Sequence, residues 1–440
     1  MRWKSAAILL AAALLAAAAA QEPLHPAPTP ISSALPAVLP SGRAAVGVAL
    51  EGGGALGLAH IGVLQWFEEH HIPVDRLSGT SMGALVGALY ATGSTPAQMR
   101  ALATSDAFTR VFTLQSPYTD LSFRRRQDRR ELPQALTVGL SHHFTLRNAL
   151  LSDRGVNEFL TGNMAAYNSQ ELDYDRFPIP FRCVATDLNT LQTVIFASGP
   201  LPQAVRASIS IPGVFSPVQD RSGHYLVDGG ILDNLPTGVL QRDFHADVII
   251  AVRLEDAPLA NADTMSIVGV LNRAFDAGIE RNAALSEQLA NIVVRVPTGG
   301  FSTTDYARAA LLIDAGYKAA QRSRADLLRY ALDDAGWQAY LTAREGRRRP
   351  APGLLHQVHV EGGTPGAVRE VLADHKPTDG QPIAPATTQD ALRRVQSNGG
   401  ISATWETFAP PAAPTAPSPS ASVEPAPDTS VMIAMVRPIC

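Results

Sequence analysis

Between residues 46 and 90 the chain twice follows one pattern, in which a short apolar run enters a glycine-rich turn and then a helical pattern. The run Val46–Leu50 enters EGGGALG, and the run 72–77 enters SGTSMG. Apolar runs of this length are typical of strands buried on both faces. Similar runs recur at 179–185, 193–197, 248–252 and 292–296, with helical patterns between and after them, notably 307–340. Strands that alternate with helices predict an α/β fold with a mostly parallel central sheet.

The second turn places Ser81 between Gly79 and Gly83, at G-x-S-x-G spacing. A serine hydroxyl is a weak nucleophile and needs exposure, a base and donors for the oxyanion. Glycines on both sides remove side chains where strand, serine and helix crowd together, which is how a strand-to-helix turn presents a nucleophile. The competing interpretation is a serine that begins a helix among small residues. The pentapeptide alone does not decide between them.

The first turn offers the donors. Gly52, Gly53 and Gly54 follow a strand and precede a helix, so their N–H groups can point into one concavity that suits a negative oxygen. The same loop also fits G-x-G-x-x-G when Gly57 is included, and Asp75 stands near the place of a ribose-binding acid. A dinucleotide-binding enzyme is therefore an alternative at this point.

The base is harder to find. In an α/β-hydrolase the order would be serine, acid, then histidine. The histidines that follow a suitable acid lack a glycine or turn context or lie far along the chain: His245, His356, His359 and His375. Asp228 is the better candidate, because it closes a strand pattern and is followed by Gly229 and Gly230 on a tight turn. An ordinary Asp-Gly turn is the structural alternative.

Taken together, EGGGALGLAHIGVL, GTSMG, ATDL, ASISIPGVFSPV and DGGILDNLP resemble the patatin-like phospholipase family in order and spacing, over residues 46–253. The resemblance implies a three-layer α/β fold and a Ser–Asp dyad, with Ser81 as nucleophile and Asp228 as general base. It assigns oxyanion donors to Gly52, Gly53 and Gly54, with turn-supporting glycines at Gly57, Gly79, Gly83, Gly229 and Gly230. Leu56 departs from the family, which often has a basic residue there.

The two ends of the chain differ in composition from this region. Residues 1–20 combine Arg2 and Lys4 with an apolar alanine-rich run and predict a cleaved signal peptide. Residues 21–43 are a Pro/Ala-rich linker, and 44–350 form the hydrolase domain. The segment 354–440 resembles, less specifically, a POTRA module of small α+β type, with a Pro-rich insert at 409–427. Such a module predicts a protein partner that docks by strand addition.

The resemblance to patatin-like phospholipases implies a serine lipid acyl hydrolase of phospholipase A type. Residues 1–20 and the POTRA-like segment predict that it is exported to the periplasm or the outer membrane. We expect a phospholipid or other lipid ester as substrate, contact with a membrane surface, and no metal or cofactor. A net charge of −4 gives no support for a nucleic-acid partner. The arginines of 124–130 could contact anionic headgroups or form internal ion pairs. A non-catalytic assembly or docking scaffold is the second alternative.

Overall fold

The computed structural model describes the chain in several ranges, which leave out both ends and some internal segments. The described residues are 42–112, 138–140, 144–146, 153–255, 267–349, 354–362, 381–382, 387–388, 390–392, 394, 401–408 and 429–438. The signal peptide, nearly all of the linker, the arginines of 124–130 and the insert at 409–427 lie outside them.

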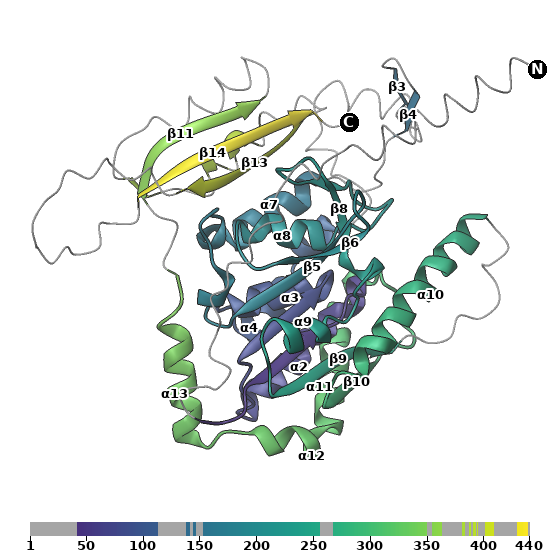
Figure 1. Cartoon of the computed structure of the whole chain (residues 1–440), viewed down its shortest axis with the longest axis vertical. Coiled ribbons are helices and arrows are strands. Elements are labelled where there is room, and N and C mark those ends of the chain that lie inside the picture. Colours follow the sequence, from purple (N-terminus) through teal and green to yellow (C-terminus); the bar gives the residue numbers. More distant parts are fainter. Residues whose placement is uncertain are drawn as a thin grey trace, which may run out of the picture. The chain divides into compact units, whose positions relative to one another are not determined.

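An eight-stranded sheet organises residues 46–297, with the strand order β10-β9-β1-β2-β5-β8-β7 and β6 paired with β5 (Figure 1). The strands are Val46–Leu50 (β1), Arg76–Thr80 (β2), Phe181–Asp187 (β5), Gln192–Phe196 (β6), Val218–Gln219 (β7), Tyr225–Asp228 (β8), Val248–Glu255 (β9) and Ile292–Pro297 (β10). The neighbours from β10 to β5 are parallel, and β6, β7 and β8 add antiparallel pairs. The mostly parallel α/β sheet expected from the sequence is confirmed.

Helices follow the strands at short intervals. They are Ala59–Glu69 (α2), Met82–Ala91 (α3), Pro96–Ala103 (α4), Asp106–Val111 (α5), Asp153–Asn163 (α7), Leu201–Ser208 (α8), Thr237–Arg242 (α9), Ile267–Glu287 (α10), Ala309–Arg322 (α11), Arg324–Leu327 (α12) and Asp334–Glu345 (α13). Single 3-10 turns are Gly54–Leu58 (η1), Ala165–Tyr167 (η3), Tyr174–Arg176 (η4), Gly229–Ile231 (η5), Tyr306–Arg308 (η6) and Leu328–Tyr330 (η7).

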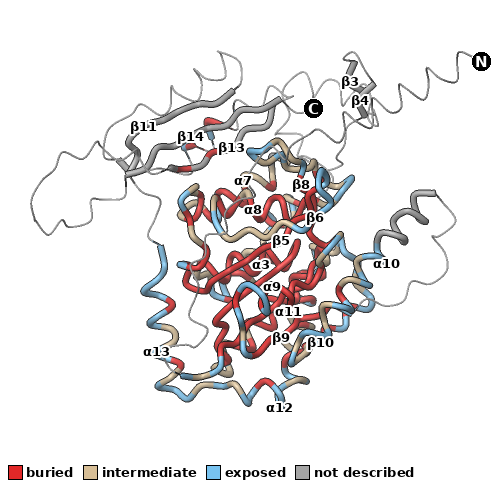
Figure 2. The backbone as a smooth tube through the Cα atoms, in the orientation of Figure 1, coloured by how far each residue is buried: buried red, intermediate tan, exposed pale blue. Residues whose placement is uncertain are grey.

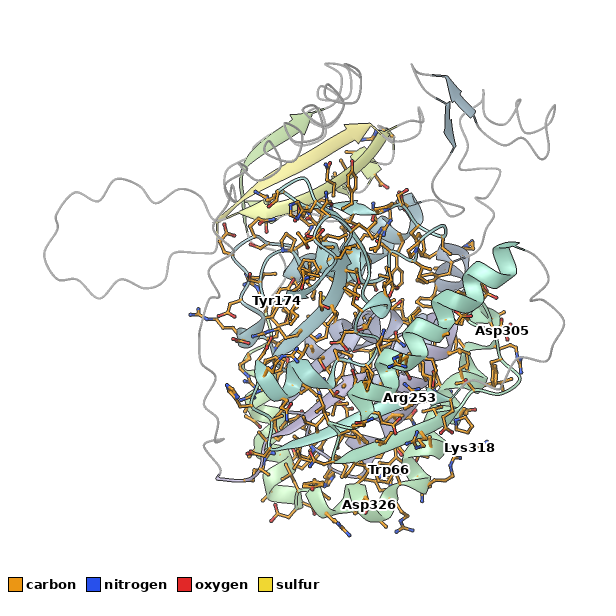
Figure 3. The ribbon with its side chains drawn as sticks, turned by 45° about the vertical axis from the view of Figure 1, so that its right-hand side comes forward. Trp66, Tyr174, Arg253, Asp305, Lys318 and Asp326 are labelled. Atoms are coloured by element: carbon orange, nitrogen blue, oxygen red, sulfur yellow. The ribbon has the colours of Figure 1, made fainter. Side chains whose placement is uncertain are left out.

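The connections place helices on both faces of the sheet. The crossovers β1–α2–β2 and β2–α3–β5 move one way across the strand order, whereas those through α9 and α10 move the other way. Because crossovers between parallel strands are right-handed, α2 and α3 cover one face and α10, between β9 and β10, covers the opposite face. α9 contacts α10 and lies on that second face as well. Helix α11 packs along α2, where the buried Trp66 (Figure 3) donates its indole N–H to Gln321 at 2.6 Å.

The core is continuous between the sheet and these helices (Figure 2). Strands β1, β2 and β5 are buried along their whole length, and so is α3. This explains why these sequences do not alternate between apolar and polar residues, although Arg76, Arg182 and Asp187 stand at or near strand ends. A rigid, fully buried layer therefore lies directly under the glycine-rich turns.

Two expected boundaries differ from the structure. The strand expected at 72–77 is β2, Arg76–Thr80, because the pairing with β1 begins only at Gly47 and Arg76. The apolar Ile72 and Val74 are buried without joining the ladder. The helical stretch expected at 307–340 is divided into α11, α12 and α13, and the side chain of Asp333 begins the last of these by accepting the N–H of Gly336.

The C-terminal segment forms a second, four-stranded sheet in the order β12-β11-β14-β13. Its strands are Leu354–Gly362 (β11), Gln381–Pro382 (β12), Ile401–Phe408 (β13) and Thr429–Pro438 (β14). β11 pairs with β14 in parallel, and β13 with β14 antiparallel. The assignment of this segment to a POTRA module stays a prediction. A further two-stranded sheet joins Val138–Leu140 (β3) and Phe144–Leu146 (β4).

Candidate active site

Two strands meet end to end along one side of β5. β2 pairs with β5 in parallel up to Thr80, and β8 takes over antiparallel at the next position, where Ala185 faces Asp228. β6 pairs with residues of β5 that also pair with β2 and with β8. It must therefore lie along the other side of β5. The end of β2 and the end of β8 therefore point toward each other. Ser81 and Asp228, far apart in the sequence, stand at this junction.

Ser81 has the strained backbone of a nucleophile turn. Its φ is 54° and its ψ is −123°, a region that L-residues other than glycine rarely adopt. Its N–H donates to the hydroxyl of Ser208 at 2.9 Å, and that hydroxyl donates to the carbonyl of Val184 on β5. Only 5% of Ser81 is exposed. The tertiary contacts thus hold an unfavourable turn in place and fix where the Ser81 hydroxyl points.

The surrounding glycines allow the close approach of this turn to its neighbours. A methyl group on Gly83 would lie 2.3 Å from the carbonyl oxygen of Leu50, and one on Gly229 would lie 2.4 Å from that of Val184. Gly57, Gly79 and Gly230 would likewise place a methyl group within 2.4 to 2.8 Å of the nearest atom. The turn-supporting glycines expected from the sequence thus all border tight contacts.

Asp228 ends β8 and begins η5. Its Oδ1 accepts the N–H of Gly230 at 2.8 Å, and its own N–H donates to the carbonyl of Ser210. Burial raises the pKa of its carboxyl from 3.8 to about 6, and hydrogen bonds from the Ser81 hydroxyl and the Gly230 N–H oppose this rise. Oδ2 has no partner of strict hydrogen-bond geometry among the described residues, so the contact with Ser81 is a loose one. A buried carboxylate of raised pKa beside a serine hydroxyl has the properties of a general base.

The glycine loop packs directly on Ser81. A methyl group on Gly52 would lie 3.1 Å from the Ser81 Cβ. The Gly52 N–H, expected to be an oxyanion donor, donates instead to the backbone carbonyl of Asn234 at 3.0 Å. Within the described residues, the N–H groups of Gly53 and Gly54 donate no such bond. The assignment of Gly53 and Gly54 as oxyanion donors stays a prediction, whereas the Gly52 N–H is already bonded to Asn234.

Asn234 connects the loop with the turn that carries Asp228. Its amide donates to the Glu51 carboxylate at 3.2 Å and lies 3.4 Å from the Gly52 carbonyl oxygen. Its own N–H donates to Asn282 on α10, whose amide also donates to the carbonyl of Gly230. Sequence reasoning missed this role, because nothing in DGGILDNLP marks one asparagine as a link between two turns.

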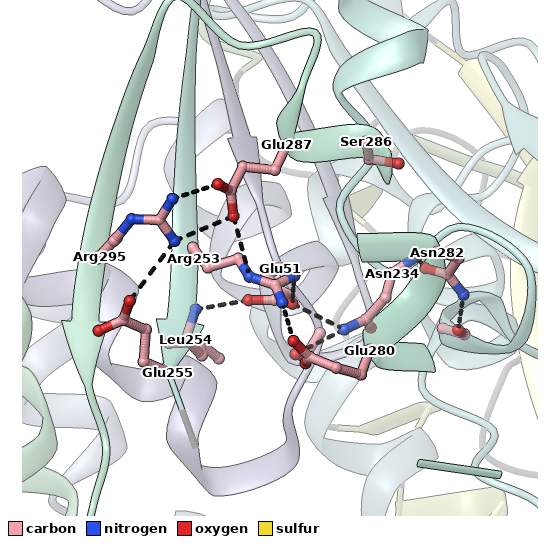
Figure 4. Close-up of polar contacts among 12 residues, drawn as sticks. Glu51, Asn234, Arg253, Leu254, Glu255, Glu280, Asn282, Ser286, Glu287 and Arg295 are labelled. Carbon is pink, nitrogen blue, oxygen red and sulfur yellow. Dashed lines mark hydrogen bonds and ion pairs between the residues drawn. The ribbon is translucent and has the colours of Figure 1, made fainter. Parts of the chain in front are cut away.

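A buried ion-pair network supports the loop from below (Figure 4). Glu51, directly before Gly52, pairs with Arg253 on β9 at 3.0 Å and accepts the N–H of Leu254. Arg253 also pairs with Glu280 and Glu287 on α10. Burial raises the pKa of Glu51 to about 8, although Arg253 and the Leu254 N–H favour its charged form. The network joins β1, β9 and α10 beneath the loop.

His60 supports the same residue from α2. Its Nε2 lies 2.7 Å from the carbonyl oxygen of Glu51, which makes the ring nitrogen the donor. The side chain is fully buried, and burial lowers its pKa to about 4. A neutral imidazole at this position fixes the carbonyl just before the glycine run. In the sequence, nothing beyond a histidine in a helical pattern indicates this contact.

The rival acid and base candidates lie elsewhere. Asp75 sits at the opposite edge of the sheet, where its carboxylate accepts the N–H of Val46 at 2.9 Å and pairs with Arg43 at 2.6 Å. It is therefore engaged away from the glycine loop and cannot serve as the ribose-binding acid. His245 precedes β9 at that same edge and is exposed. Of the other candidate histidines, His356 and His359 belong to the second sheet and His375 lies outside the described residues.

Fold and site together define an α/β protein in which a strand-to-helix serine meets a buried aspartate beside a glycine loop. Residues 48–240 match the family model described as patatin-like phospholipase. This part of the chain belongs to that family, as the sequence motifs predict.

Curated relatives share this region. A patatin-like phospholipase domain-containing protein of Caenorhabditis elegans is 32% identical over 47% of the chain and 13% of its own length. An uncharacterized NTE family protein of Mycobacterium tuberculosis is 34% identical over 52% of the chain and 55% of its length. The lysophospholipase NTE1 of Coccidioides immitis is 29% identical over 62% of the chain and 17% of its length. The chain thus spans about half or less of the length of these relatives.

Proposed function

We propose that this protein hydrolyses acyl esters of lipids as a phospholipase A-type enzyme, through an acyl-enzyme on Ser81. The observation that carries the proposal is the junction of β2 and β8, which brings the strained Ser81 to the buried carboxyl of Asp228. Family membership and the similarity to a protein named lysophospholipase support the choice of a lipid ester.

In the first half-reaction, Asp228 accepts the proton of the Ser81 hydroxyl as Oγ attacks the ester carbonyl carbon. The negative charge that develops on the carbonyl oxygen lies toward the N–H groups of Gly53 and Gly54 and the start of α3. Collapse of this intermediate breaks the bond to the alcohol, which takes the proton from Asp228. The products are an acylated Ser81 and a free lipid alcohol.

In the second half-reaction, Asp228 removes a proton from a water molecule, which attacks the acyl carbonyl. Collapse now breaks the bond to Ser81 Oγ, the proton returns to this oxygen, and the fatty acid leaves. The raised pKa of Asp228, about 6, suits both roles, because a base works best when its pKa is near the working pH. The Ser208 hydroxyl takes no part in the chemistry and acts only by holding the Ser81 backbone.

The test compares the wild type with Ser81→Ala and Asp228→Asn on a soluble fluorogenic medium-chain ester and on phosphatidylcholine vesicles. We expect both variants to lose a factor on the order of 10⁴ or more in kcat/KM. Ser323→Ala, between α11 and α12, is the matched control and should keep wild-type rates. Undiminished turnover by Ser81→Ala would exclude the acyl-enzyme on Ser81, and no turnover by the wild type would favour the scaffold.

The setting of the reaction is part of the same proposal. We place the enzyme outside the cytoplasm, in the periplasm or at the outer membrane, on the sequence of residues 1–20 alone. Among the described residues, no helix combines the length and the apolar character needed to cross a membrane. The second sheet is proposed to bind a protein partner by strand addition.

A further inference from the structure

The hairpin between β5 and β6 projects beyond the active site. β5 runs two residues past Ala185, the position facing Asp228, and then turns through 188–191 into β6. At about 3.3 Å per residue, the turn begins roughly 10 Å beyond Asp228, on the same edge of the sheet. β8 starts beside this turn, with Tyr225 as the residue that faces Leu188.

Large apolar side chains are exposed at this tip. Leu188 is 44% exposed, Leu191 69% and Tyr225 48%. Leu188 donates its N–H to the carbonyl of Tyr225, so the two residues are cross-strand neighbours and their side chains share one face. We call these three residues the apolar tip. Single exposed apolar residues are common on soluble proteins, but three large apolar side chains together beside a candidate active site are not explained by packing.

The turn that carries the apolar tip is held firmly. Asp187 accepts the N–H groups of Asn189 and Thr190 and the Thr190 hydroxyl, and its second oxygen lies 2.8 Å from His224 Nδ1. The Asn189 side chain in turn accepts the N–H of Tyr225. These hydrogen bonds hold the turn in one conformation before any partner binds. Less conformational entropy is then lost when the exposed side chains make contact with a partner.

Leu191 also has an unfavourable backbone. Its φ is 56°, in the left-handed region where glycine or asparagine would be the unstrained choice. The sequence thus places a leucine at an exposed position of the turn although folding alone favours another residue. The Leu191 N–H donates to the Asp187 carbonyl at 2.9 Å, so the hairpin turn holds this conformation in place. A large apolar residue at a position that favours glycine or asparagine points to a role in binding.

We propose that the apolar tip inserts into a lipid surface and holds the site against it, so that esters reach Ser81 from the lipid phase. This inference rests on the proposed function for the substrate but not for the binding itself. The tip is uncharged and apolar, which suits the acyl region near the headgroups rather than a protein partner that needs polar pairing. Its position on the rim that carries Ser81 and Asp228 directs the site toward the same surface.

The experiment measures sedimentation with phosphatidylcholine vesicles and turnover on those vesicles and on a soluble ester. Leu188→Ser/Leu191→Ser should bind vesicles at least about tenfold more weakly and lose vesicle turnover in proportion, because two apolar side chains no longer enter the lipid. Its rate on the soluble ester should match the wild type, which also shows that the fold is intact. Leu289→Ser, 40% exposed just before β10 at the opposite edge, is the matched control and should bind as the wild type does.

The outcomes separate the two proposals. Vesicle binding by the double variant equal to that of the wild type would overturn the role of the apolar tip, whatever the ester rates. Vesicle binding that depends on the tip in a protein without ester turnover would keep the tip and refute the hydrolase. A dimer of the wild type in analytical ultracentrifugation that the double variant abolishes, without a change in vesicle binding, would assign the tip to a second copy of this chain.

Discussion

The pKa of Asp228 connects activity with stability in a way that one substitution can test. The carboxyl has a pKa of about 6 in the folded chain, whereas its ordinary value is 3.8. A folded state that holds its proton more tightly loses stability as the pH rises from about 4 to about 6, and the loss is complete above that range. At about 1.4 kcal/mol per pKa unit, the ionised Asp228 costs about 3 kcal/mol at neutral pH.

Asp228→Asn removes this cost, because a neutral amide can still accept the Gly230 N–H. We expect the variant to be inactive and yet more stable than the wild type by about 2–3 kcal/mol above pH 7, with little difference near pH 4. Ser81→Ala is also inactive but removes a hydrogen bond that lowers the pKa of Asp228. Its loss makes the ionised carboxyl more costly to bury, so at neutral pH this variant should unfold at a lower free energy than the wild type.

Urea unfolding of the three proteins at about pH 4, 6 and 8, followed by circular dichroism, measures these differences. A stability gain for Asp228→Asn that is the same at every pH, or a loss at neutral pH, would refute the assignment of a buried, charged base. Activity gives a second readout, since kcat/KM of the wild type on a soluble ester should fall below an apparent pKa of about 6.

Three further substitutions test the supports of the site. Arg253→Met removes the cation that opposes the raised pKa of Glu51, about 8, so the buried carboxyl becomes neutral and loses a hydrogen-bond donor; the free energy of unfolding should fall by about 1–3 kcal/mol, with little further loss when Glu51→Gln is added, as measured by urea unfolding. Gly54→Ala must place a methyl group 2.5 Å from the Thr303 carbonyl oxygen at a φ of +55°, so ester turnover should fall by about 10²-fold or more, measured beside circular dichroism. Ser208→Ala removes the acceptor of the nucleophile's N–H and should lower kcat about tenfold with little change in KM, a split that steady-state kinetics resolves.

Local sequence patterns determined a large part of the fold. β1 and β9 begin where their apolar runs begin, at Val46 and Val248, and α2 and α3 follow the two glycine-rich turns as expected. These patterns are local, because a buried strand must be apolar on both faces and a sharp turn must contain glycine. For the same reason Ser81 could be assigned to a strand-to-helix turn from a few neighbouring residues.

Contacts between distant parts of the chain could not be obtained this way. The pairing of Ser81 with Asp228 had support from the family resemblance, but its physical cause is that β2 and β8 share one side of β5. The loss of Gly52 as a donor depends on the carbonyl of Asn234, which a one-dimensional pattern does not reveal. The contacts by which Glu51 and His60 hold the glycine loop could not be predicted either, because the sequence of a charged or polar residue does not indicate that it is buried.

The sequence by itself thus determined the strand-turn-helix units, the nucleophile turn and the family of residues 48–240. Only the tertiary structure decided that the Gly52 N–H is bonded to Asn234, what raises the pKa of Asp228, and that Leu188 and Leu191 are exposed. The division has one physical cause. Turn chemistry and apolar periodicity act between neighbours along the chain, whereas burial, ion pairing and strand register are set by residues that only the folded sheet brings together.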